Sequence, residues 1–102
     1  MSSELINGNI LVFNVSENGE IGELNIAGEV KNFIADMSEV KIEVIELIKN
    51  NLITFGQSID PKKGSFVIVS THQFDENLNI VPTMQEAFDY IEMEEIERQL
   101  DF

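Results

Sequence analysis

Runs of apolar residues divide the chain into strands and helices. Residues Asn9–Val15 place apolar side chains on both faces of an extended segment, which is typical of an interior strand. The turn sequence Ser16–Glu20 follows, and its Asn-Gly pair tolerates the positive φ angles of a tight hairpin. We therefore expect an antiparallel partner strand over Glu20–Ala27 and, after a second turn, a buried strand over Val30–Met37.

The next segment, Ser38–Phe55, has the spacing of an amphipathic helix, with Ser38 as a candidate cap. The stretch Val40–Val44 also alternates like a strand, so a strand there is the alternative. Gly56 ends the helix or opens a loop. The continuous apolar run Ser65–Ser70 then predicts a second buried strand, and the strand–helix–strand order predicts a parallel βαβ unit.

A capping box marks the start of the last helix. Thr83 and Glu86 have its spacing, and a short strand over Leu78–Val81 is expected before them. The inner apolar stripe of this helix is predicted at Met84, Ala87, Phe88 and Ile91. Farther along, the apolar positions move to another face, at Met93, Ile96 and Leu100. We therefore expect a bend or a change of packing partner near Glu92–Glu94.

Composition limits the class of protein. The 102 residues, 43% of them hydrophobic, suit a single domain over residues 1–102. Nineteen acidic against six basic residues give a net charge of −13, which disfavours nucleic acid and anionic membranes as partners. Cysteine is absent from the sequence, so disulfides and thiolate sites are excluded. The sequence has no membrane-spanning run, and Met1–Gly8 lacks the basic start of a signal peptide, so we expect a cytoplasmic protein.

The sequence contains no recognisable catalytic motif. His72 is the only histidine, and no metal-ligand spacing surrounds it, so a solvent-exposed loop histidine is the simpler interpretation. Neither a glycine-rich phosphate loop nor a nucleophilic serine motif is present. We expect no catalytic residue, no metal and no cofactor, and therefore no enzyme. A small enzyme that uses carboxylates is the third hypothesis, after two kinds of interaction protein.

The acidic end of the last helix has two interpretations. Glu94, Glu95, Glu97 and Asp101 crowd the negative end of the helix dipole, where each acidic group costs stability. Such a surface meets a basic partner or a second copy of the chain, with a homodimer as an open alternative. The simpler interpretation is a solvated, fraying tail that keeps the protein soluble.

Two segments resemble the STAS domain, the module of bacterial anti-sigma-factor antagonists. The run Val30–Lys41, with Asp-hydrophobic-Ser-x-Val at its end, is similar to the family's third strand and the turn after it. Gly64–Val69 and Asn79–Arg98 are similar to the last strand and last helix of short STAS-like proteins, mostly from Bacteroidetes, that end in an acidic tail. The resemblance covers about half the chain. It implies an α/β fold with a mixed sheet of four to five strands, helices mainly on one face, and the family's first helix missing.

The chain departs from the family at the regulatory site. Without gaps, the phosphorylated serine of the family falls on Ile45, which cannot be phosphorylated. The resemblance therefore implies a non-catalytic interaction module in transcription regulation, like an anti-sigma-factor antagonist but without its serine switch. Its contacts would come from Glu43, Glu46 and Lys49, unless these simply form the solvated face of the helix.

The alternative is an accessory subunit. In that hypothesis an acidic helix, through Glu94, Glu95 and Glu97, docks on a basic cytoplasmic enzyme. Short relatives with this tail are encoded beside ribonuclease Z, so an RNA-processing enzyme is a candidate partner.

Overall fold

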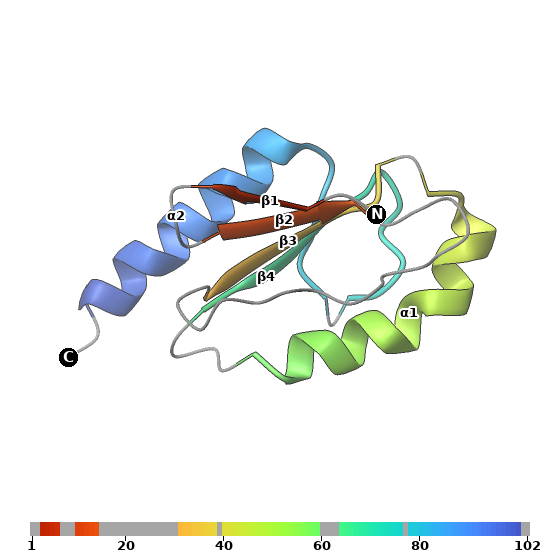
Figure 1. Cartoon of the computed structure of the whole chain (residues 1–102), viewed down its shortest axis with the longest axis horizontal. Helices are drawn as coiled ribbons and strands as arrows, with labels where there is room; N and C mark the ends of the chain where they lie inside the picture. The colour runs from red at the N-terminus through yellow and green to blue at the C-terminus, as the bar shows by residue number, and fades with distance from the viewer. Residues whose placement is uncertain are drawn as a thin grey trace.

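One sheet forms the centre of the fold (Figure 1). The computed structural model describes residues 3–6, 10–14, 31–38, 40–59, 64–76 and 78–100. Within these residues the elements are β1 (Ser3–Ile6), β2 (Ile10–Asn14), β3 (Asn32–Asp36), α1 (Ile42–Gln57), β4 (Phe66–Val69), β5 (Ile80–Val81) and α2 (Met84–Leu100). The strands lie side by side in chain order, from β1 to β5.

The sheet is mixed but mostly parallel. Strand β1 is antiparallel to β2, whereas β2, β3, β4 and β5 all run in the same direction. Helix α1 connects β3 to β4, whose register sets Phe33 opposite Phe66. The predicted mixed α/β sheet and its parallel βαβ unit are therefore confirmed.

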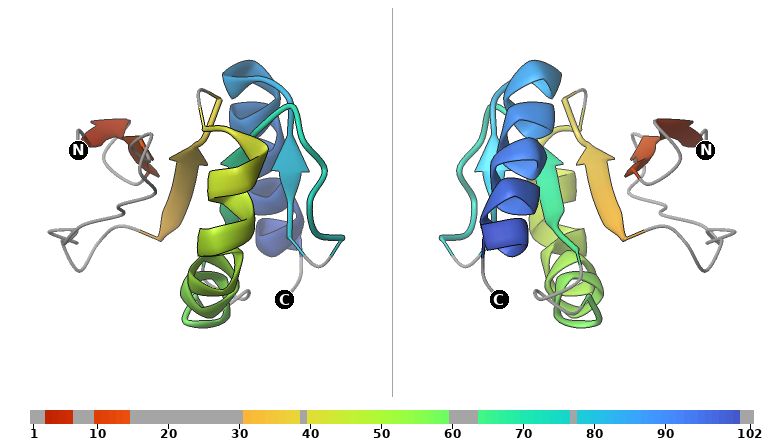
Figure 2. Two further views of the ribbon diagram at one scale, coloured as in Figure 1. Left: turned by 90° about the vertical axis from the view of Figure 1, so that its right-hand side faces the viewer. Right: turned by 90° about the vertical axis from the view of Figure 1, so that its left-hand side faces the viewer.

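The two helices lie on opposite faces of the sheet, as both views of Figure 2 show. On one face, Ile45 and Leu52 of α1 belong to the same core cluster as Phe33. On the other, Ala87 and Ile91 of α2 pack with side chains that include Ile34, Val67 and Val69. The expectation of helices mainly on one face is wrong. Successive residues of a strand point to opposite faces of the sheet, so a strand that is apolar throughout needs a helix packed on each face.

Strand β2 is an interior strand, as predicted, because β1 and β3 flank it. The sequence did not reveal β1, which pairs Ser3 with Phe13. The predicted turn Ser16–Glu20 and strand Glu20–Ala27 lie outside the described residues. So does the segment where the first helix of the STAS family would fall, between β2 and β3.

Helix α1 starts later than the sequence predicted. Ser38 does not cap it, because the Ser38 hydroxyl and backbone N–H both donate to Asp36 Oδ1, at 2.7 and 3.1 Å. Lys41 is the N-cap residue and makes no side-chain cap hydrogen bond. At the other end the helix continues through Gly56, where a Cβ would lie 3.1 Å from the Phe66 ring. Glycine at this position lets that ring pack against the helix backbone.

Helix α2 starts where the capping box predicts. The Glu86 backbone N–H donates to Thr83 Oγ1 at 3.2 Å, and that hydroxyl is 3.5 Å from Glu86 Oε2. The helix then continues without interruption to Leu100. What changes near Glu92–Glu94 is the packing partner: the inner side turns from apolar contacts to polar ones. Among the described residues, no helix combines the length and apolar character needed to cross a membrane.

Candidate functional site

A buried polar cluster joins the second half of α2 to the sheet. Asn32 and Ser65 stand at the amino ends of the adjacent strands β3 and β4, and both side chains are buried. Asn32 Oδ1 accepts from the Ser65 backbone N–H at 3.0 Å, which fixes the two strand starts together. Asn32 Nδ2 donates to Glu95 Oε1 at 2.6 Å, and Ser65 Oγ donates to Glu94 Oε1 at 2.8 Å. Two acidic side chains of α2 are thus held by polar groups of the sheet.

Arg98 supplies the positive charge of this cluster. Its guanidinium donates to Ser65 Oγ at 3.2 Å and to Asn32 Oδ1 at 3.3 Å. Tyr90 lies on the same side of α2, one turn before Glu94. Burial raises the pKa of Tyr90 above 10.0, and the charge of Glu94 and a hydrogen bond to it act in the same direction. The charge of Arg98 opposes this shift.

The outer face of α2 carries a second apolar stripe. Met93, Ile96 and Leu100 are 60%, 46% and 70% exposed. They follow one another at i, i+3 and i+7, so they lie along one side of the helix. The exposed Glu92 and Glu97 each stand one turn away from a stripe residue. We call Met93, Ile96 and Leu100 the outer stripe; it lies opposite the buried Ala87 and Ile91.

The predicted contact residues of α1 are on the surface. Glu43 and Glu46 are exposed, and Lys49 Nζ lies 3.9 Å from Glu46 Oε2. The neighbouring Leu47 is 81% exposed. Ile45, by contrast, is fully buried against the sheet. The position that the resemblance assigns to the phosphoserine therefore faces the core in this chain.

The three predicted contact residues of α2 differ in surroundings. Glu94 and Glu95 are half-buried and bonded to Ser65 and Asn32, whereas Glu97 is exposed. Glu94 and Glu95 therefore hold α2 on the sheet.

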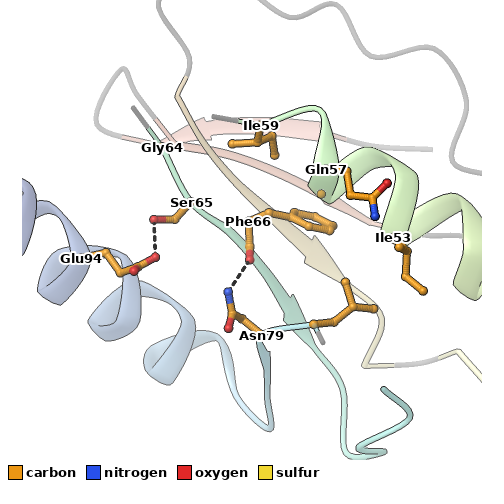
Figure 3. Close-up of a pocket in the computed structure, with 10 residues that line it drawn as sticks. Ile53, Gln57, Ile59, Gly64, Ser65, Phe66, Asn79 and Glu94 are labelled. Atoms are coloured by element: carbon orange, nitrogen blue, oxygen red, sulfur yellow. Dashed lines mark hydrogen bonds between the residues drawn. The ribbon is translucent and has the colours of Figure 1, made fainter. Parts of the chain in front are cut away.

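A cavity of about 250 Å³ opens where β4 begins (Figure 3). Its walls come from the end of α1, the start of β4, the residues before β5, and Glu94 of α2. Figure 3 shows Ser65 and Glu94 facing each other on one side of β4, with the Phe66 ring on the other side.

Within the described parts of the chain, no three histidine, aspartate or glutamate side chains are grouped to hold a metal ion. His72 is exposed, as expected.

Sequence reasoning missed Asn32, Ser65 and Arg98. One signal was present, since a polar residue precedes the apolar run of each central strand. This signal identifies a polar cluster only when the register of β3 and β4 is known, because the register places the two polar residues side by side.

Comparison with family models, with curated proteins and with solved structures finds no match in any of the three.

Proposed function

We propose that this chain is a non-catalytic protein–protein interaction module whose main contact surface is the outer stripe of α2. The observation that carries the proposal is the distribution of exposed apolar side chains. Four large ones are exposed among the described residues, and three of them form this stripe. The spacing i, i+3, i+7 is the one by which a helix seats itself in an apolar groove of another protein.

The second half of α2 is held in place before any partner arrives. Its inner side is bonded to the sheet through Glu94, Glu95 and Arg98. A contact surface on a fixed helix avoids the entropy cost of ordering a loose tail on binding. This arrangement supports a docking surface better than a fraying, solvated tail.

The charge around the stripe favours a basic partner. Glu92 and Glu97 flank the stripe, and the chain carries a net charge of −13. A second copy of the chain would bring like charges together, whereas a groove with a basic rim would attract the helix and guide its approach. RNA-processing enzymes are one class of cytoplasmic protein with such basic surfaces.

The exposed Leu47 favours a second candidate surface on α1. It directly follows the exposed Glu46 and lies one turn after the exposed Glu43, in the region that the STAS resemblance gives to partner contacts. In this candidate, the chain is a divergent STAS-like antagonist in the bacterial cytoplasm that acts in transcription regulation without a serine switch. The parallel β3–α1–β4 unit and the helix after the last strand support it.

Two matched substitutions separate the candidates. Ile96→Glu places a charge in the outer stripe, and Leu47→Glu places the same charge on α1; both sites are exposed, so the fold should persist. We expect a basic protein that binds the wild type and Leu47→Glu equally, and binds Ile96→Glu at least tenfold more weakly. The measurement is quantitative capture from bacterial cytosol, followed by binding kinetics with the purified partner at low and high salt.

Other outcomes are equally informative. A partner that Leu47→Glu loses and Ile96→Glu keeps would assign the contact to α1, and a partner kept by both variants would rule out both surfaces. Self-association of the wild type in sedimentation experiments, abolished by Ile96→Glu, would assign the stripe to a second copy. Deletion of residues 92–102 is a poor substitute, because it removes the groups that bond Asn32 and Ser65.

A further inference from the structure

The short length of β5 leaves a gap at the edge of the sheet. β5 begins at Ile80, which lies opposite Ile68. Among the described residues, the first part of β4 therefore has no neighbouring strand on the edge that faces away from β3. The side chain of Asn79 covers part of the gap, since Asn79 Nδ2 donates to the Phe66 carbonyl at 3.4 Å. The cavity of about 250 Å³ occupies this place, between α1 on one face of the sheet and α2 on the other.

The walls of the cavity are apolar on one side and polar on the other. The apolar lining comes from Ile53, Ile59, Phe66 and Leu78. Gln57, Ser65, Asn79 and Glu94 supply the polar groups. Ligand pockets usually measure roughly 300–1,000 Å³, so this volume suits only a small group.

Among the described residues that line the cavity, Glu94 is the charged one. Its carboxylate accepts hydrogen bonds from Ser65 Oγ and from the Tyr90 hydroxyl, and both of these donors are neutral. Among the described residues no lysine or arginine lies within ion-pair distance of it. Arg98 bonds the same serine hydroxyl but is not among the residues that line the cavity. In a chain with net charge −13, an anion would be repelled from this site and a cation attracted.

We propose that this cavity binds a primary ammonium group carried on a short apolar chain. The ammonium lies against Glu94 and the hydrocarbon against Phe66 and Leu78. Such a group occurs in free alkylamines and in the lysine side chain of a polypeptide. The site is independent of the proposed contact surface, because Glu94 lies on the inner side of α2 and the outer stripe does not line the cavity.

The probe is n-butylammonium, followed by chemical shifts of the backbone amides in NMR titrations of the full chain. We expect saturable shifts of Gly64, Ser65, Phe66 and Asn79 in the millimolar range, with butanol and butyrate at least tenfold weaker. Glu94→Gln keeps the shape of the side chain and an acceptor for Ser65, and should weaken butylammonium binding at least tenfold. Glu97→Gln removes the same charge from an exposed position one turn away and should leave binding unchanged.

A lysine tripeptide with blocked ends distinguishes the two sources. Tighter binding of the tripeptide assigns the cavity to a lysine side chain of a protein, and tighter binding of butylammonium assigns it to a free amine.

Equal binding of butanol and butylammonium overturns the proposal, as does equal weakening by Glu94→Gln and Glu97→Gln. Circular dichroism and the melting temperature establish that both variants are folded. The Ile96→Glu variant should bind butylammonium normally, so failure of one proposal leaves the other intact.

Discussion

At the scale of the residue, the side chain of Asn32 is fully buried and both of its polar atoms are hydrogen-bonded. It links a strand neighbour, Ser65, to two residues of α2, Glu95 and Arg98. An aliphatic residue of the same size would satisfy none of these partners. Because a buried polar group without a partner is costly, this asparagine specifies how α2 sits on the sheet.

Asn32→Ala should therefore destabilise the protein strongly. The substitution leaves the Ser65 N–H without its side-chain acceptor and removes one hydrogen bond each from Arg98 and Glu95. We expect a loss of about 2–4 kcal/mol in the free energy of unfolding, measured by urea denaturation.

Asn50→Ala is the matched control. Asn50 is exposed in the middle of α1, and its replacement should change stability by no more than about 0.5 kcal/mol. Similar losses in the two variants would mean that the bonds of Asn32 contribute little beyond those available in water.

At the scale of the element, α2 performs two tasks with two faces. Its inner side is apolar in the first half and polar in the second, and its outer side carries the exposed stripe. The first turn fixes where the helix begins, through the bond between Thr83 and the Glu86 N–H. Every later residue depends on that start for the face on which it falls.

Thr83→Ala tests this start. Loss of the cap should cost about 1 kcal/mol in the free energy of unfolding, because one N–H of the first turn loses its acceptor. Thr54→Ala is the control: that hydroxyl bonds the Asn50 carbonyl inside α1, where the backbone already has its partners, so we expect a change below about 0.5 kcal/mol. Thermal and urea unfolding measure both; an unchanged Thr83→Ala variant would contradict the cap.

The elements that the sequence predicted well are those with local signals. The unbroken apolar runs Phe33–Ala35 and Phe66–Val69 mark buried strands, and Thr83 with Glu86 marks a helix start. The outer stripe was also visible as a shift of face along the last helix. Each of these signals extends over a few neighbouring residues.

What the sequence did not predict depends on distant contacts. Asn32 and Arg98 are 66 positions apart, and their bond requires the sheet register and the rotation of α2 together. The placement of helices on opposite faces is of the same kind. Because the strands carry apolar residues on both faces, each face of the sheet must be packed against a helix. The sequence of a single segment does not indicate which helix packs on which face.

At the scale of the whole molecule, charge is the dominant feature. With 19 acidic and 6 basic residues, the folded chain repels itself, and neighbouring acids on α1 and α2 add to this. Salt screens such repulsion: the Debye length falls from about 30 Å at 0.01 M to about 8 Å at 0.15 M. The same screening weakens attraction to a basic partner.

Salt should therefore have opposite effects on folding and on partner binding. Between about 0.01 and 0.15 M sodium chloride we expect the melting temperature to rise, because repulsion within the folded chain decreases. Over the same range the association rate with a basic partner should fall. Calorimetry and stopped-flow mixing measure the two. A melting temperature that falls with salt would mean that attractive pairs, such as Lys49 with Glu46, outweigh the repulsion.

The cover that α2 provides has a consequence during synthesis. Synthesis adds β2, β3 and β4 before residues 84–100, so a chain that ends before Met84 has a bare sheet face at Ile34 and Val67, while α1 can still pack on the other side. Such a truncated chain presents an apolar surface to the cell. Translation that terminates before Met84 would release a chain with a half-covered sheet, which chaperones and proteases bind through its exposed apolar face.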